Sequence, residues 1–180
     1  MKYCNECGTP VEFRIPPDDT LPRHVCPGCG TIHYQNPKLV VGCIAEWKGE
    51  ILLCRRAIEP RIGLWTLPAG FMENAESTAQ AALRETLEEA CARVEIDALF
   101  SLINIPHIDQ VHLFYRARLL DCDFAPGVES LETALFSEAD IPWEQIAFRS
   151  VTQCIKAYFS DRRNGAFDFH EEVLSPPNAY

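Results

Sequence analysis

The chain has 180 residues, of which 47% are apolar and 23% are charged, as expected for a folded protein with room for one ordinary domain and a small module. The formal net charge of −10 argues against broad nucleic-acid binding, which requires clustered Lys and Arg. No apolar run reaches the roughly 18 residues of a membrane-spanning helix, and the first residues do not resemble a secretory signal peptide. We therefore expect a cytoplasmic protein that does not associate with membranes.

Two Cys-x-x-Cys pairs lie near the start of the chain, in the stretches CNECG and CPGCG. The 18 residues between the pairs match the spacing of a tetrahedral four-cysteine zinc site. A segment of about 35 residues cannot bury enough apolar surface to fold alone, so a structural Zn²⁺ would supply the missing stability. Two disulfides are the alternative, and a reducing compartment disfavours them. The expected zinc ligands are Cys4, Cys7, Cys26 and Cys29.

The other five cysteines show no ligand spacing. We expect them to be small buried apolar residues rather than catalytic thiols. They are Cys43, Cys54, Cys91, Cys122 and Cys154.

In chain order, the pattern divides into residues 1–35 as a zinc ribbon, 36–163 as the main domain and 164–180 as a tail without a strong pattern. The apolar runs LVVGCIAEW and ILLCRRA flank KGE and predict a β-hairpin. A helix follows TLPAGF, then the runs VEIDALFSLINI and VHLFYRARLL predict further strands, and residues 142–162 fit an amphipathic helix. This order predicts an α+β or α/β sandwich with helices on a mixed sheet.

The helix after TLPAGF lies in the stretch GFMENAESTAQAALRETLEEA. Ser77 and Gln80 have the spacing of a capping box at its start. At about 100° per residue, one stripe of the helix would face the sheet. That stripe consists of Ala79, Ala82, Leu83, Thr86, Leu87 and Ala90.

Three glutamates, Glu85, Glu88 and Glu89, fall together on the flank of this helix. At about 6 Å and an effective dielectric constant near 20, each pair of carboxylates would repel by roughly 3 kcal/mol. No Lys occurs between Lys48 and Lys156 to offset this charge, although Arg84 is placed to hold one carboxylate. A solvated acidic face is one interpretation, and a hard cation bound by oxygen ligands, Mg²⁺ or Mn²⁺, is the other.

The same stretch resembles the Nudix box, G-x5-E-x7-R-E-U-x-E-E-x-G-U, in which U is a bulky apolar residue. Gly70 opens the match, Glu76 follows, and Arg84 and Glu85 precede Glu88 and Glu89 at the required spacing. Three positions depart from the pattern: Thr86, Cys91 and Ala92. Cys91 stands where the family has a glycine that ends the helix in a left-handed conformation, which would cost a cysteine about 1 kcal/mol.

The resemblance implies a Nudix-type α/β/α sandwich with a mixed sheet, preceded by a small zinc ribbon. It implies that Glu85, Glu88 and Glu89 hold divalent metal near a pyrophosphate, with Gly70 shaping the loop. The family often adds an acid from a later loop, and we favour Glu129 there as a metal ligand or base. We expect substrate contacts from Arg55, Arg56, Trp65 and Glu132, with Phe71, Tyr115 and Arg61 as further options.

The whole chain resembles Nudix hydrolases that cleave FAD to FMN and AMP, or ADP-ribose to AMP and ribose 5-phosphate. The expected partner is thus a small dinucleotide-like substrate, not a nucleic acid, and family habit suggests a homodimer. NADH and nucleoside triphosphates are alternative substrates, although the SQPWPFPxS motif usual in the NADH branch is absent from the sequence. A zinc-ribbon binding or regulatory module with an inactive hydrolase site is the alternative of a different class.

Overall fold

The computed structural model describes residues 1–176, which divide into two compact units: Met1–Pro37 and the chain from Lys38 onward. The first unit is a three-stranded antiparallel sheet built from β1 (Glu12–Arg14), β2 (Arg23–Val25) and β3 (Ile32–His33). Within the described residues no helix is both long and apolar enough to span a bilayer.

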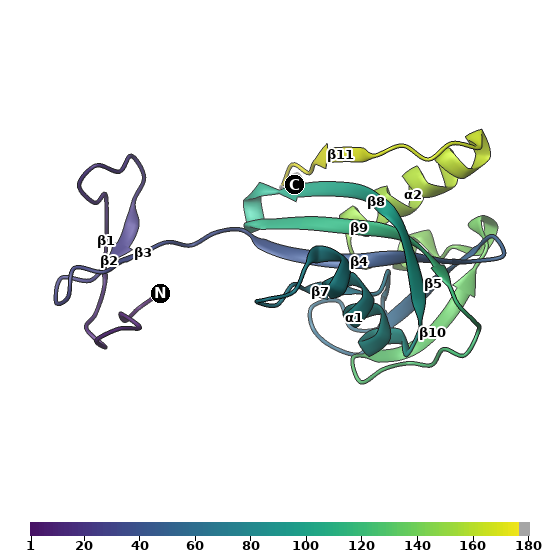
Figure 1. Ribbon diagram of the computed structural model, residues 1–180, viewed down its shortest axis with the longest axis horizontal. Helices are drawn as coiled ribbons and strands as arrows, with labels where there is room; N and C mark the ends of the chain where they lie inside the picture. Colours follow the sequence, from purple (N-terminus) through teal and green to yellow (C-terminus); the bar gives the residue numbers. More distant parts are fainter. Residues whose placement is uncertain (177–180) are drawn as a thin grey trace. The chain divides into compact units, whose positions relative to one another are not determined.

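The second unit is built on an eight-stranded sheet, whose main path runs β10-β5-β4-β9-β8-β11, with β6 paired to β5 and β7 paired to β4 (Figure 1). The pairs β4–β9 and β8–β11 are parallel and the others antiparallel, so the sheet is mixed as the sequence predicts. The strands are β4 (Lys38–Trp47), β5 (Glu50–Arg56), β6 (Trp65–Thr66), β7 (Ala69–Phe71), β8 (Val94–Ile105), β9 (Gln110–Leu119), β10 (Ser130–Phe136) and β11 (His170–Val173).

Two α-helices, α1 (Thr78–Ala90) and α2 (Arg149–Asn164), cover the sheet, because its strands are apolar on both faces. Neighbouring residues of β4 face opposite cores: Ile44 packs with Ile155 and Phe159 of α2, whereas Cys43 packs with Ala82 of α1. The result is the α/β/α sandwich that the resemblance implies. Short 3₁₀-helices at Pro106–Ile108, Glu138–Asp140 and Trp143–Gln145 connect the elements.

The KGE hairpin is confirmed: Lys48 and Gly49 both have positive φ, 49° and 95°, and join β4 to β5. The second helix is shorter than predicted and begins at Arg149 rather than near residue 142. The reason is that Ile146 forms a parallel bridge with Trp65, and the Ala147 N–H donates to the Trp65 carbonyl at 2.8 Å. These bonds hold the chain extended before α2.

The expectation of a patternless tail after residue 163 is wrong for the segment that forms β11. The helix α2 ends at Gly165, whose φ of 73° reverses the chain. The Asp161 carboxylate then accepts hydrogen bonds from the Asp168 N–H at 3.0 Å and from His170 Nε2 at 2.7 Å. This bonding returns the chain to the sheet, where β11 pairs with β8.

The prediction that these cysteines are buried is confirmed for Cys43, Cys54 and Cys154 and wrong for Cys91 and Cys122, which are exposed. Cys91 adopts the left-handed conformation, with φ 49° and ψ 22°, and its N–H donates to the Leu87 carbonyl. It therefore ends α1 as the family's glycine would, and its exposure follows from that position.

The loop before β10 is docked on the carboxyl end of α1. The Ala125 N–H donates to the Ala90 carbonyl and the Gly127 N–H to the Glu89 carbonyl, each at 2.9 Å. These bonds satisfy carbonyls that the helix leaves without partners. A Cβ atom at Gly127 would lie 1.7 Å from the Glu88 carbonyl oxygen, so only glycine permits this approach.

We expect Gly127→Ala to lower the free energy of unfolding by about 3 kcal/mol, because the added methyl group overlaps helix backbone that cannot move aside. Urea denaturation measures the change. Gly63→Ala is the control, because its methyl group meets no atom within 4 Å and adds only left-handed strain of about 1 kcal/mol. Equal losses in the two variants would contradict the docking argument.

Candidate active site

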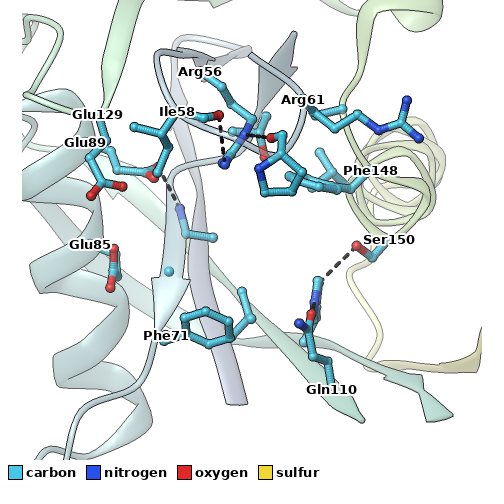
Figure 2. A pocket seen from close by; sticks show the side chains of 18 of the residues that line it. Arg56, Ile58, Arg61, Phe71, Glu85, Glu89, Gln110, Glu129, Phe148 and Ser150 are labelled. Carbon is cyan, nitrogen blue, oxygen red and sulfur yellow. Dashed lines mark hydrogen bonds between the residues drawn. The ribbon is translucent and has the colours of Figure 1, made fainter. Parts of the chain in front are cut away.

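A cavity of about 1130 Å³ opens between α1, the loop after β5, the start of β9 and the start of α2 (Figure 2). Glutamates of α1 and of the loop before β10 line one side, and Gln110 and Ser150 lie on the opposite side (Figure 2). Arg56, Arg61 and Arg149 also line the cavity. The lining includes Arg56, Gly70, Phe71, Glu85, Glu88, Glu89, Gln110, His112, Glu129, Phe148 and Ser150.

The helix α1 begins with the capping box that the sequence predicts: the Gln80 N–H donates to Ser77 Oγ at 3.2 Å, and the Ser77 N–H donates to Gln80 Oε1 at 2.8 Å. The predicted buried stripe, however, is wrong at Leu83 and Leu87, which are exposed. Small residues allow the helix to pack closely on the sheet, and its buried face is therefore rotated toward the glutamates. The buried residues of α1 are Ala81, Ala82, Glu85, Thr86, Glu89 and Ala90.

The carboxylate of Glu85 lies against the backbone of Gly70. A Cβ atom at Gly70 would stand 2.2 Å from Glu85 Oε2, so glycine is required for this contact. Glu85 is only 8% exposed, and burial raises the pKa of its carboxyl above the ordinary value, although Arg84 acts in the opposite direction.

Glu89 is 6% exposed, and its Oε2 accepts a hydrogen bond from the Ala69 N–H at 3.0 Å. Burial raises the pKa of this carboxyl to about 7, and the negative charges of Glu85 and Glu129 act in the same direction. Two buried carboxylates thus face one cavity with fewer hydrogen bonds than a fully stabilised pair of charges needs.

Arg84 is the cation of this cluster, and it partly neutralises the charge that the sequence left unpaired. Its guanidinium bonds to Glu76 at 2.8 and 3.0 Å, to Glu85 at 2.7 Å and to Glu88 at 3.1 Å, and it donates to the Phe71 carbonyl at 3.1 Å. Glu88 is exposed, whereas Glu89 receives no bond from Arg84. The expected restraint of a carboxylate by Arg84 is confirmed.

Glu129 joins the acidic wall through the docked loop, as Figure 2 shows beside Glu89. Its side chain is exposed and lines the cavity, and its charge raises the pKa of both Glu85 and Glu89. The structure thus brings Gly70, Glu85, Glu88, Glu89 and Glu129 to the same cavity.

Among the expected substrate contacts, Arg56 lines the cavity, while Arg55, Trp65 and Glu132 do not. Arg55 and Arg56 are consecutive in β5, so their side chains leave opposite faces of the strand. Arg55 pairs with Glu132 at 3.5 Å outside the cavity. Trp65 is a core residue that packs edge-on against Phe136, with ring centroids 4.9 Å apart.

The Arg56 guanidinium lies over the Phe148 ring, 5.1 Å from its centroid, and Nε donates to the Pro60 carbonyl at 2.8 Å. Of the further options, Phe71 and Arg61 line the cavity. Tyr115 does not line it, and its hydroxyl is hydrogen-bonded to Thr78 Oγ1 at 2.7 Å.

Sequence reasoning missed Gln110, His112 and Ser150, which form a hydrogen-bonded row on the opposite wall. His112 Nδ1 lies 3.0 Å from Ser150 Oγ, and Nε2 lies 2.9 Å from Gln110 Oε1. Burial lowers the pKa of His112 to about 4. The only signal in the sequence is a histidine inside the apolar run VHLFY, which by itself does not distinguish a cavity residue from a core residue.

The four ribbon cysteines form the second site. Their sulfur atoms all lie within 4.8 Å of one another, and all four thiols are free, which favours a metal cluster over the two-disulfide alternative. Sγ of Cys4 lies 3.7 Å from that of Cys29, and Sγ of Cys7 lies 3.4 Å from that of Cys26. Zn–S bonds of about 2.3 Å would place tetrahedral sulfurs about 3.8 Å apart, so the cluster fits Zn²⁺.

Backbone N–H groups support the cluster: those of Glu6 and Cys29 donate to the sulfurs of Cys4 and Cys26, each at 3.4 Å. Gly8 and Gly30, which follow the second cysteine of each pair, have φ of 74° and 77°, a left-handed conformation that glycine adopts without strain.

The acidic wall also fits a cation. Its ligand atoms are carboxylate oxygens, the donors that Mg²⁺ and Mn²⁺ prefer. Burial raises the pKa of both Glu85 and Glu89, so a cation bound beside them would favour their charged forms.

Comparison with known proteins agrees with this architecture. The family model described as "Nudix N-terminal" matches residues 2–35, and the one described as "NUDIX domain" matches residues 36–158. A zinc-ribbon cluster, an α/β/α sandwich and a glutamate-bearing helix at its cavity define a ribbon-containing Nudix hydrolase. The chain belongs to the Nudix family.

A crystal structure of a NUDIX hydrolase from Nitrosomonas europaea is 56% identical, with a TM-score of 0.95, and the match covers 98% of this chain and 100% of that one. The NAD-capped RNA hydrolase NudC of Pseudomonas aeruginosa is 28% identical over 169 residues, which cover 92% of this chain and 58% of that protein. The ADP-ribose pyrophosphatase of Methanocaldococcus jannaschii is 28% identical over 113 residues, 61% of this chain and 67% of that protein. These NudC matches cover most of this chain but little more than half of each NudC protein.

We expect Cys26→Ser to abolish zinc binding, because Cys26 is buried at the centre of the ribbon and a hydroxyl is a poor zinc ligand. Elemental analysis of the purified protein should give one zinc per parent chain and almost none in the variant. Cys122→Ser is the matched control, since Cys122 is exposed and outside the cluster. Full zinc content in Cys26→Ser would contradict the assignment.

We expect His112 to make the protein less stable in acid. Because its pKa of about 4 in the folded state lies below the ordinary 6.5, the unfolded chain binds the proton first as the pH falls. The contribution of neutral His112 to the free energy of unfolding is fully present above about pH 6.5. About 3 kcal/mol is lost as the pH falls from there through 4.

Urea denaturation across this pH range gives the free energy of unfolding of the parent and of His112→Asn. The effect of His112 is the difference between their two pH profiles. The parent should lose about 3 kcal/mol more than the variant. His107→Asn is the matched control, because it makes the same substitution at an exposed histidine. Parallel pH profiles for the parent and His112→Asn would show that His112 is not held neutral by burial.

Proposed function

We propose that this protein hydrolyses the diphosphate bond of a small nucleotide-derived substrate with the help of a divalent cation, and that ADP-ribose or FAD is that substrate. The observation that carries the proposal is the pair of buried carboxylates, Glu85 and Glu89, at the wall of a large open cavity. Burial of two incompletely neutralised acids is costly for a protein that uses them only as structural groups.

Glu85, Glu88, Glu89 and Glu129 are the residues that would hold Mg²⁺ or Mn²⁺. A bound divalent cation would neutralise the diphosphate and lower the pKa of a coordinated water. Gly70 keeps the Glu85 carboxylate in the cavity, and the Ala69 N–H fixes one oxygen of Glu89. Glu129 lines the cavity beside Glu89, where its carboxylate is the proposed base for the attacking water.

Arg56 is the proposed contact to a substrate phosphate. Its Nε and one terminal nitrogen donate to the carbonyls of Pro60 and Ile58, and the stacking on Phe148 keeps its plane fixed. The remaining N–H groups can donate to phosphate oxygens. Phe71 is half-exposed in the same cavity and offers a ring on which a base can stack.

The size of the cavity supports a substrate with two groups joined by a diphosphate. Its volume of about 1130 Å³ is slightly above the roughly 300–1,000 Å³ typical of ligand pockets. ADP-ribose is supported further by the name of the Methanocaldococcus relative, and NADH or capped RNA by the names of the NudC relatives. The net charge of −10 favours a small substrate over RNA. A homodimer and a cytoplasmic location stay predictions.

The experiment is a substrate panel of ADP-ribose, FAD, NADH, NAD, NAD-capped RNA and nucleoside triphosphates, each with Mg²⁺ or Mn²⁺ and with products separated by chromatography. We expect AMP from ADP-ribose or FAD. Absence of turnover with every substrate would instead support the regulatory-module alternative.

We expect Glu89→Gln to lower kcat on the preferred substrate by about 10²–10⁴-fold, because the amide removes a charged oxygen ligand from the cavity. Glu132→Gln is the matched control, since Glu132 pairs with Arg55 outside the cavity. If Glu89→Gln turned over as fast as the control, the assignment of the acidic wall would be incorrect.

A further inference from the structure

The two sides of the cavity differ in their chemistry. Figure 2 shows Glu85 and Glu89 on one side and Gln110 and Ser150 on the other. The second side holds no carboxylate among its hydrogen-bonded row of Gln110, His112 and Ser150. Metal chemistry at the acidic wall does not account for these three residues.

The direction of the hydrogen bonds in the row follows from the chemistry of its members. His112 is neutral because burial lowers its pKa to about 4, so only one ring nitrogen carries a proton. Gln110 Oε1 can only accept, and His112 Nε2 at 2.9 Å is therefore the donor. His112 Nδ1 then accepts from the Ser150 hydroxyl at 3.0 Å.

This arrangement fixes the orientation of the Gln110 amide. Ser150 and His112 are 1% and 8% exposed, so packing holds these two buried members of the row in place. Gln110 opens β9, paired with Ile105 of β8 and Lys38 of β4, which makes its backbone part of the sheet. Since its oxygen is occupied by His112, its NH₂ group is the part available to the cavity.

We propose that the Gln110 amide binds an uncharged, hydrogen-bond-accepting group of the substrate, a sugar hydroxyl or a heterocyclic carbonyl, and that His112 and Ser150 position it. The inference rests on the proposed hydrolysis of a nucleotide-derived diphosphate. Gln110 is the specificity-determining residue, and the other two act through it.

The uncharged amide of Gln110 suits a neutral group rather than a further phosphate. Ile105, Ile108 and Phe148 line the same cavity and provide apolar contacts. Two cations near the row already have partners: Lys38, which pairs with Gln110 across β4 and β9, has its Nζ over the Phe71 ring, 5.0 Å from the centroid, and Arg149 donates to the Ser175 carbonyl at 2.8 Å. A primary amide carries no net charge and selects acceptors by geometry.

The test is calorimetric binding of the non-hydrolysable α,β-methylene analogue of ADP-ribose with Mg²⁺ to the full chain. The variants are Gln110→Ala, Ser150→Ala and their double variant. Gln153→Ala is the matched control, because Gln153 is exposed on α2 and outside the cavity. Thermal denaturation of each variant reports separately on folding.

We expect about tenfold weaker binding for Gln110→Ala, because one hydrogen bond to the ligand is lost. We expect about threefold weaker binding for Ser150→Ala, because the Gln110 amide is then held less firmly. The double variant should bind like Gln110→Ala alone, because Ser150 acts only through Gln110. KM should rise in Gln110→Ala while kcat stays within about threefold. Comparing ADP-ribose with FAD shows whether the sugar or the flavin carbonyl is the bound group.

Binding by Gln110→Ala within twofold of the parent would overturn the inference, and so would losses that multiply in the double variant. In both cases turnover by the parent and its loss in Glu89→Gln would leave the proposed function standing. A parent that neither binds the analogue nor cleaves any diphosphate in the panel would remove the basis of both.

Discussion

The burial of Glu85 and Glu89 beside the Ala69–Gly70 backbone is the constraint on which the site depends. Removing carboxylates from water is unfavourable unless hydrogen bonds or opposite charges replace the water. Here the Ala69 N–H supports Glu89, and Arg84 supports Glu85 while also bonding to Glu88. The pKa of both buried acids is nevertheless raised. A divalent cation held by these carboxylates would supply the missing charge, and this would connect the packing of one helix to the proposed chemistry of the cavity.

The fold makes this burial possible by bringing three distant segments together. The strand β7 presents Gly70, whose missing side chain is the space that Glu85 occupies. The small residues of α1 let the helix approach the sheet closely, and the loop before β10 binds the last carbonyls of α1 through Gly127. Glu129 reaches the cavity because that loop is docked. The second core under α2 carries the opposite wall, where Ser150 and His112 meet.

Features with a local physical cause could be predicted from the sequence. The cysteine pairs, the capping box and the spacing of Glu85 and Glu89 require only neighbouring residues and a helical period.

Features set by tertiary contacts could not be predicted. Leu83 and Leu87 look like core residues, yet α1 is rotated so that the glutamates face inward. Arg55 and Arg56 look equivalent until the strand register separates them, and His112 and Ser150 are 38 residues apart. The strand β11 forms because Asp161 binds Asp168 and His170, a contact without a periodic pattern.

The most direct test of the central claim is anomalous diffraction from crystals that contain Mn²⁺ and α,β-methylene ADP-ribose. We expect an anomalous peak at about 2.0–2.4 Å from carboxylate oxygens of Glu85 and Glu89, the range of metal–oxygen bonds for such cations, with the methylene diphosphate on its far side. A fully bound analogue with no peak at these two carboxylates would contradict the view that they are buried in order to bind a cation.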